Sequence, residues 1–372
     1  MKKKAIYLGG GFRQHQYLYM LPIIDSFCKK NKINTIIIER KLIKKTFTHP
    51  MINKIKKRYN IVYLPDLIKR NKVEFKINLF FVLIYFFLKY FFIKGKNLRE
   101  KDTWISTQIK HSIWDFAIKI NKDKFDSLEL LPRLKSIYYS SLYYCYSILL
   151  LKYYKIDFSF FQHFVYFERT LFANLRRKKV TLIQKSFHVL RVQKKNYDLS
   201  SNYLDKKIYK NSFKFIKRRK IQNYWKEYLS GRSKYLEAKQ ASVIKNKSNS
   251  SKNVIFLHVF RDSPFICIDQ ERIFDDYFHW FISTLKIIKN SHESWQIRIH
   301  PSSIKWGENP NKIINYAKKE IFNGNFPKNI SIVKNKLSNL ENFKNAKRIV
   351  TYAGHSHLEA ACFGIKPIII SN

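Results

Sequence analysis

Residues 348–370 read RIVTYAGHSHLEAACFGIKPIII, and this stretch decides the class of the fold. Its two ends, 348–352 and 367–370, are rich in β-branched residues, which predicts strands, and 356–363 between them has a helical pattern. A strand, a helix and a strand in this order are typical of two parallel strands joined by a crossover helix. We therefore expect an α/β fold with a parallel sheet.

The same alternation extends through the rest of the C-terminal third. Strands are predicted at 254–260, 295–300 and 330–333, and helices at 273–289, 311–322 and 337–344. Together with 348–370, these segments predict one parallel sheet with its helices between 254 and 372.

The N-terminal half begins with a second unit of the same kind. Lys4–Leu8 reads as a buried strand, the glycines at 9–11 as a tight loop, Gln16–Lys30 as a helix and Ile33–Glu39 as the next strand. Further strands are predicted at 60–64, 156–161 and 180–184, and a helix at 136–154. This order predicts a Rossmann-like domain.

The boundary between the two halves is predicted at SVIKNKSNSSKN, residues 242–253, which has the polar composition of a linker. We expect an N-terminal Rossmann-like domain with helical insertions over 1–241 and a C-terminal Rossmann-like domain over 254–372. No internal repeat recurs at a fixed spacing.

The 372 residues include 72 Lys and Arg against 26 Asp and Glu, a formal charge of +46. This excess favours anionic partners. An AT-rich genome also enriches Lys, so the charge alone does not choose among phosphate, anionic lipid and nucleic acid. The four cysteines are far apart and form no CxxC pair, which gives no sign of a zinc site or a disulfide framework and favours a reducing cytoplasm.

An aromatic and basic stretch covers 72–101. Its longest apolar run, Leu79–Leu88, is shorter than the roughly 20 residues that a spanning helix needs. A helix lying on a membrane surface and a buried helix between domains both fit this composition. We expect a cytoplasmic protein that is peripheral on the inner face of the cell membrane.

Three motifs follow predicted strands of the C-terminal sheet, so they should meet at its carboxyl edge. In HVFRDSP, 258–264, Arg261 can pair with phosphate, and Asp262 can accept a proton or a sugar hydroxyl. In RIHPSS, 298–303, His300 can donate to a phosphate oxygen and, if protonated, offset charge on a departing nucleotide. Taken alone, each of these two motifs favours a structural interpretation, an ordinary turn for the first and a structural histidine for the second.

The third motif is TYAGHSHLEAACFGIKP, 351–367. Gly354 permits close approach of the backbone, and His355 with Ser356 begins a helix whose free amides attract phosphate. Glu359, one turn later, can accept hydrogen bonds from ribose hydroxyls. Ser356 and Glu359 also fit the capping-box pattern S-x-x-E, and the two roles can coexist.

In this order, the three motifs resemble the C-terminal half of bacterial capsule polysaccharide biosynthesis proteins, which are GT-B glycosyltransferases and include the retaining Kdo transferases. The resemblance covers 254–372 well, and the N-terminal half only in its βαβ start and in HFVYFERTLFANLRRKKV, 163–180. It implies two Rossmann-like domains facing a cleft. Because such proteins usually continue with further helices where this sequence stops, the C-terminal domain is expected to be truncated.

The resemblance implies transfer of a sugar from a nucleotide donor, with CMP-Kdo suggested, to a growing capsule or lipopolysaccharide chain. The positions expected to bind the nucleotide-sugar are Arg261, His300, Pro301, Ser302, Ser303, Gly354, His355, Ser356 and Glu359. The acceptor-side positions are Gly10, Gly11, Arg13 and His163, and the candidate catalytic acid or base residues are Asp262 and Glu168. No cofactor or metal is expected, because no clustered carboxylates require one.

Two other interpretations stay open. A CDP-glycerol-type glycerophosphotransferase would share the fold and the use of a helix start to hold phosphate. A noncatalytic nucleic-acid or membrane-binding protein would use the charge of +46 and the 16% aromatic content. Against the nucleic-acid interpretation, the sequence has no recognised RNA- or DNA-binding motif.

Overall fold

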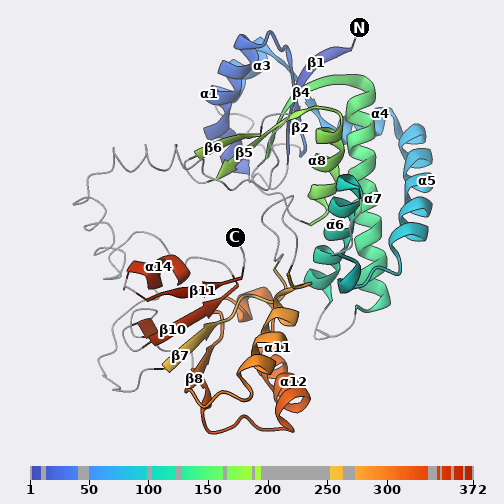
Figure 1. Ribbon diagram of the computed structural model, residues 1–372. Helices are drawn as coiled ribbons and strands as arrows, with labels where there is room; N and C mark the ends of the chain where they lie inside the picture. The colour runs from blue at the N-terminus through green and yellow to red at the C-terminus, as the bar shows by residue number, and fades with distance from the viewer. Residues whose placement is uncertain are drawn as a thin grey trace. The chain divides into compact units, whose positions relative to one another are not determined.

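The computed structural model describes residues 2–9, 14–40, 50–98, 103–121, 128–161, 166–186, 189–193, 252–262, 273–333, 342–343, 346–352, 356–362 and 365–370. These residues divide into two compact units, one containing the described residues up to 193 and the other those from 252 onwards. Each unit contains one sheet (Figure 1). The predicted boundary at 242–253 lies outside the described residues, except for the last two of its positions.

The sheet of unit 1 has six strands, and its order is β3-β2-β1-β4-β5-β6. The strands are β1 (Lys3–Leu8), β2 (Thr35–Ile38), β3 (Asn60–Tyr63), β4 (Tyr154–Phe161), β5 (Thr181–Ser186) and β6 (Val189–Gln193). All neighbouring pairs are parallel except β5 and β6, which are antiparallel. The order of the first five strands is that of a Rossmann fold, which confirms the predicted class.

Helices cover both faces of this sheet. They are α1 (Gln14–Lys30), α3 (Pro50–Arg58), α4 (Leu64–Arg70), α5 (Lys72–Tyr90), α6 (Trp104–Ile120), α7 (Leu130–Tyr153) and α8 (Glu168–Arg177), with the 3-10 helix η1 (Gly95–Leu98). In β1, Ala5 and Tyr7 join the core beneath α7 and α8, whereas Ile6 and Leu8 join the core beneath α1 and α3. The alternation follows from the pleat of the strand.

The contacts between α6, α7 and α8 include buried polar side chains. The Thr170 hydroxyl donates to the Ser112 Oγ at 2.8 Å, and Ser112 pairs with Ser140 at 3.0 Å. Arg169 and Asp115 are both fully buried and form an ion pair with an N–O distance of 3.5 Å. These contacts fix α8 against α6 and α7, because a buried polar group without its partner is costly.

Unit 2 has a five-stranded, wholly parallel sheet of order β11-β10-β7-β8-β9. Its strands are β7 (Lys252–Phe256), β8 (Trp295–Arg298), β9 (Ile330–Val333), β10 (Ala346–Thr351) and β11 (Pro367–Ile369). Its helices are α11 (Tyr277–Ile288), α12 (Pro310–Phe322) and α14 (Ser356–Cys362), with the 3-10 helix η3 (Ile304–Trp306). The predicted second Rossmann-like sheet is confirmed.

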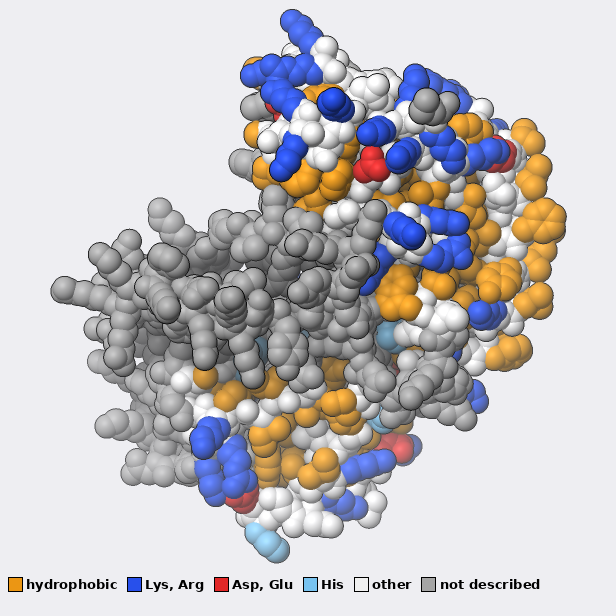
Figure 2. Space-filling view, turned by 45° about the horizontal axis from the view of Figure 1, so that its top comes forward, with side chains coloured by type: hydrophobic (Ala, Val, Ile, Leu, Met, Phe, Trp, Pro, Cys, Tyr) orange, Lys and Arg blue, Asp and Glu red, His pale blue; other side chains and the backbone are white. Residues whose placement is uncertain are grey.

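The core of unit 2 also has two sides. Ile255 packs in the cluster formed with α11 and α12. Val254 and Phe256 pack on the other side, in a cluster with Phe343 and with Ala360, which belongs to α14. On the described surface seen in Figure 2, blue lysine and arginine side chains far outnumber red acidic ones. The fold class is thus established for each unit, while their arrangement about a cleft remains a prediction.

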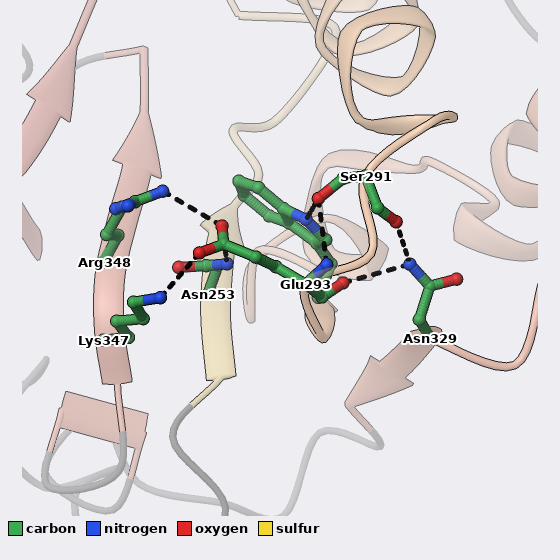
Figure 3. A network of polar contacts seen from close by, with 7 residues as sticks. Asn253, Ser291, Glu293, Asn329, Lys347 and Arg348 are labelled. Carbon is green, nitrogen blue, oxygen red and sulfur yellow. Dashed lines mark hydrogen bonds and ion pairs between the residues drawn. The ribbon is translucent and has the colours of Figure 1, made fainter.

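A polar network at the amino ends of the unit 2 strands closes that edge of the sheet (Figure 3). Glu293 accepts hydrogen bonds from Asn253 (2.9 Å), Lys347 (2.6 Å) and Arg348 (3.0 Å). Asn329 donates to the carbonyl oxygens of Ser291 (2.6 Å) and Glu293 (3.0 Å). These bonds hold β7, β9 and β10 to the turn before β8. The opposite, carboxyl edge is where a parallel sheet binds ligands.

Candidate functional site

Aromatic and imidazole rings gather at the carboxyl edge of the unit 2 sheet. His258 follows β7, and its ring centroid lies 6.3 Å from that of His300, which follows β8. Tyr352 follows β10, and its centroid lies 6.5 Å from that of His258. Because β7 lies between β8 and β10, His258 is the central ring. One described residue from each of the three motifs, His258, His300 and Tyr352, thus lies at this edge.

Tyr277 completes this group, which we call the imidazole–tyrosine cluster (His258, Tyr277, His300 and Tyr352). Asp276 caps α11 by accepting a hydrogen bond from the His279 N–H at 2.6 Å, so Tyr277 begins the helix at a fixed position. Its ring stacks on that of His258, with centroids 4.4 Å apart and planes 9° apart. Stacking of this kind holds the His258 ring in one orientation.

His300 is a neutral hydrogen-bond donor. Burial, with the positive charges of His258 and Arg298, lowers the pKa of His300 to about 4. Its Nδ1 accepts a hydrogen bond from the Ser302 N–H at 3.1 Å, so the proton of the neutral ring lies on Nε2. Near neutral pH, what His300 offers a phosphate oxygen is therefore an uncharged N–H.

The turn after His300 is tied to the segment after β7. The Ser303 N–H donates to the His300 carbonyl at 3.1 Å, and the Glu308 N–H donates to the Ser303 carbonyl at 3.0 Å. The buried Glu308 carboxylate accepts a hydrogen bond from the Arg261 N–H at 2.7 Å. Burial raises the pKa of Glu308, and the bond from Arg261 opposes the rise. Glu308 thus joins Arg261 to the turn that carries Ser302 and Ser303.

The other predicted residues of unit 2 lie near this edge or outside the described residues. The Arg261 Nη1 approaches the Trp306 carbonyl at 3.5 Å, and the Asp262 N–H closes a turn on the Val259 carbonyl at 3.0 Å. Ser356 begins α14, and Glu359 of the same helix is buried. Gly354 and His355 lie outside the described residues. Pro301 is exposed at the start of the turn.

In unit 1, the candidate Glu168 is buried at the first position of α8. Burial and the neighbouring Glu39 raise the pKa of Glu168 to about 8, while Arg40 and Lys119 oppose the rise. Glu39 follows β2, and its Oε1 accepts a hydrogen bond from the Tyr143 hydroxyl at 2.8 Å. Glu168 is therefore not a solvent-exposed charge on the surface of the helix, and at neutral pH it holds its proton. The four acceptor-side predictions, Gly10, Gly11, Arg13 and His163, lie outside the described residues.

Several residues of these two groups were not predicted as site residues, namely His258, Tyr277, Tyr352, Glu308 and Glu39. His258 was placed inside a strand predicted to run to Phe260, whereas β7 ends at Phe256. A shorter strand would have put this imidazole in the loop at the carboxyl edge. Glu308 has no local signal, because its partner Arg261 is 47 residues away.

No protein-family model matches the sequence, and no curated protein matches it either. Among solved structures, the chain is similar to the UDP-GlcNAc 2-epimerase of Methanocaldococcus jannaschii in complex with UDP-GlcNAc and UDP, with 14% identity and a TM-score of 0.30. That similarity covers 99% of this chain and 83% of the epimerase.

Two transferases are similar at the same low level. The Thermosulfurimonas dismutans KpsC, a β-Kdo 2,4 transferase, has 10% identity and a TM-score of 0.36, over 57% of this chain and 68% of that one. The Escherichia coli heptosyltransferase WaaC with ADP-2-deoxy-2-fluoro heptose has 11% identity and a TM-score of 0.23, over 98% of this chain and 88% of that one. At these values the similarity does not extend to activity.

Proposed function

We propose that this chain is a GT-B glycosyltransferase whose unit 2 binds a nucleotide-sugar donor. The observation that carries the proposal is His300, an uncharged imidazole that directs a donor Nε2–H from the carboxyl edge of a parallel sheet, beside His258. In open α/β folds this edge is where nucleotides bind. A neutral donor can approach a diphosphate without the cost of desolvating a second charge.

The same edge offers further donors for a diphosphate. Ser302 carries a hydroxyl in the turn that begins at Pro301, whereas Ser303 is buried and its side chain hydrogen-bonds Glu308. Arg261 is held beside this turn through Glu308. Gly354, His355 and Ser356 would add backbone N–H groups at the start of α14, and Glu359 would accept hydrogen bonds from the ribose. Fixed donors of this kind stabilise the charge of a departing nucleotide without reorganising.

The proton that leaves the acceptor hydroxyl needs a receiving group. We assign this role to Asp262, which follows the donor-side strand β7 in the sequence. Glu168 of unit 1, whose pKa is raised to about 8, would be the other candidate. In its ionised form it would take up this proton on the side of Gly10, Gly11, Arg13 and His163, where the acceptor would bind. A glycan or glycolipid of the capsule or lipopolysaccharide type is the acceptor class that we propose, with a CMP-linked sugar such as CMP-Kdo as the donor.

A thermal-shift series tests the donor site. The melting temperature is measured with CMP, CDP, UDP and GDP for the native chain, for His300→Ala and for His292→Ala. The imidazole of His292 is exposed and precedes β8, whereas His300 follows it. Ligand at about 100 times its Kd stabilises the folded state by about 2.7 kcal/mol. We expect one nucleotide, CMP above the others, to raise the melting temperature of the native chain and of His292→Ala but not of His300→Ala.

Absence of stabilisation by every nucleotide would overturn the proposal. Donor screening then separates the enzyme classes, since release of CMP from CMP-Kdo is expected and turnover of CDP-glycerol would instead identify a glycerophosphotransferase. Salt-dependent binding of nucleic acid with no turnover of any donor would identify a noncatalytic basic protein.

The location that we propose is cytoplasmic, in peripheral contact with the inner face of the membrane. A lipid-linked acceptor would be reached from there. The support is the exposed apolar surface that α5 gives to unit 1.

A further inference from the structure

Helix α5 is apolar on two faces, and only one of them is used by the core. Phe75, Phe86 and Tyr90 are buried against the rest of unit 1. On the other side, six large apolar residues are between 42% and 74% exposed: Ile77, Phe80, Phe81, Ile84, Tyr85 and Leu88. Their spacing of three and four residues places them on one side of the helix, which we call the outer face of α5. Figure 2 shows orange side chains gathered along this side of unit 1.

Lysines border the outer face. At about 100° per residue, Lys76 and Lys89 fall on its two long borders, and both are exposed. Lys72 and Lys94, also exposed, lie at or beyond the two ends of α5. The Lys89 Nζ lies 3.2 Å from the Tyr85 hydroxyl, so its charge is at the level of the polar tip of that ring. The outer face is therefore an apolar strip with a positive border.

The acidic group of α5 does not cancel this border. Glu74 is the single acidic residue of the helix, and it accepts hydrogen bonds from Lys152 at 2.6 Å and from the Tyr153 hydroxyl at 2.9 Å. These partners come from the end of α7, so the Glu74 charge is directed toward α7. The electrostatic potential on the exposed side of α5 is thus positive.

We infer that the outer face of α5 docks on an anionic lipid bilayer, with the helix axis parallel to the membrane plane. This inference rests on the membrane contact proposed above and gives it a surface and a lipid chemistry. Aromatic and aliphatic side chains bordered by lysines are suited to the boundary between headgroups and acyl chains. None of the described helices has the length and hydropathy to cross a bilayer.

Charge decides between a bilayer and a second copy of the chain. Because lysines lie at both ends and both borders of the outer face, parallel and antiparallel pairing of two copies would each bring lysines together. The formal charge of +46 adds to this repulsion. An anionic bilayer would instead attract the same lysines.

Co-sedimentation of the full chain with vesicles tests the inference. Two vesicle preparations are compared, phosphatidylcholine alone and phosphatidylcholine mixed with phosphatidylglycerol. We expect binding to the mixed vesicles that weakens with salt, because charge contributes to it. The double substitution Phe81→Ser with Leu88→Ser is expected to reduce the partition coefficient about tenfold or more, and Lys76→Gln with Lys89→Gln about tenfold.

Matched controls come from unit 2. Ile287→Ser removes an apolar side chain that is 78% exposed, and Lys319→Gln removes an exposed charge, and both are expected to leave binding unchanged. Circular dichroism and the melting temperature verify that each variant is folded. The nucleotide thermal shift, measured on the same samples, is expected to survive in the α5 variants.

Each other outcome has a definite meaning. If the native chain binds vesicles and the α5 variants bind them equally well, the protein contacts membranes through another surface, and the assignment of the outer face of α5 is overturned. No vesicle binding by the native chain would overturn both, whatever the nucleotide result. A native dimer that Phe81→Ser with Leu88→Ser dissociates, detected by light scattering, would show that the face joins two copies instead.

Discussion

The backbone N–H of Arg261 donates to the Glu308 carboxylate at 2.7 Å, and this bond ties the segment after β7 to the segment after β8. Both segments carry residues of the proposed donor site. A change at Glu308 should therefore act on the site without touching a group that contacts the ligand.

We expect Glu308→Ala to lower the free energy of unfolding by about 1–3 kcal/mol, because the partly buried Arg261 N–H loses its acceptor. Glu308→Gln keeps an acceptor oxygen and should cost less. Nucleotide stabilisation should fall in the alanine variant. Urea unfolding and thermal shift measure the two effects, with Glu320→Ala on the exposed side of α12 as the control. Equal behaviour of the Glu308 and Glu320 variants would contradict the assignment.

The titration of His300 predicts a pH dependence of stability. Its pKa of about 4 in the folded chain lies below the ordinary value of about 6.5, so protons bind preferentially to the unfolded chain. The stabilisation is complete above about pH 6.5 and is lost as the pH falls toward 4, by at most about 3 kcal/mol. Unfolding experiments across this range should show a shallower loss in His300→Gln than in the native chain. Parallel profiles for the two proteins would show that His300 does not titrate as described.

Glu168 predicts a dependence of the opposite sign. Because its pKa is raised to about 8, the folded chain keeps a proton that the unfolded chain releases near pH 4.5, and stability is lost as the pH rises through that interval. The loss is at most about 5 kcal/mol. Glu168→Gln should therefore become more stable than the native chain as the pH approaches 8, as measured by denaturant unfolding.

The same variant separates stability from catalysis. If Glu168 takes up the proton of the acceptor hydroxyl, Glu168→Gln loses sugar transfer while its nucleotide thermal shift on unit 2 stays unchanged. Full transfer activity in this variant would remove Glu168 from the proposed mechanism. Glu39→Gln, which leaves Glu168 in place, should lower the pKa of Glu168 because one source of repulsion is gone.

The amino-edge network in unit 2 supplies a prediction about stability alone. Asn329→Ala removes two hydrogen bonds, to the carbonyl oxygens of Ser291 and Glu293, and should lower the free energy of unfolding by about 1–2 kcal/mol. Since these bonds lie at the edge opposite His300, nucleotide stabilisation should persist. Chemical denaturation and the thermal shift, run on one preparation, compare the two effects. A lost nucleotide response would mean that the two edges are coupled.

Periodicity predicted every strand except β6, and most clearly the central strands such as β2 and β7, which are short apolar runs buried on both faces. It failed on α6, whose buried face includes Gln108, His111 and Asp115. Such residues look solvent-exposed in a sequence, and contacts with other segments make them internal: Asp115 pairs with Arg169 of α8, and the His111 ring lies against the Leu98 carbonyl of η1. Of the glycines predicted to form a loop after β1, only Gly9 lies within the described residues, and a Cβ there would lie 2.5 Å from the buried Tyr7 hydroxyl.

The candidate site also has some features that the sequence predicts and others that it does not. His300 and Arg261 were found from the sequence because each follows a strand, and a strand end is a local signal. The stack of Tyr277 on His258 and the bond from Arg261 to Glu308 depend on contacts between distant segments. The raised pKa of Glu168 depends on Glu39, which lies more than a hundred positions earlier in the chain.

The buried pair of Arg169 and Asp115 has a consequence for engineering this protein. Arg169 is adjacent to Glu168 in the chain and cannot leave its place without stranding a charge in the interior, so α8 would resist displacement during redesign. The pKa of Glu168 could then be adjusted by substituting Glu39, Arg40 and Lys119, while the backbone of α8 keeps its position. Variants at those three positions would form a graded series in proton affinity on one unchanged scaffold.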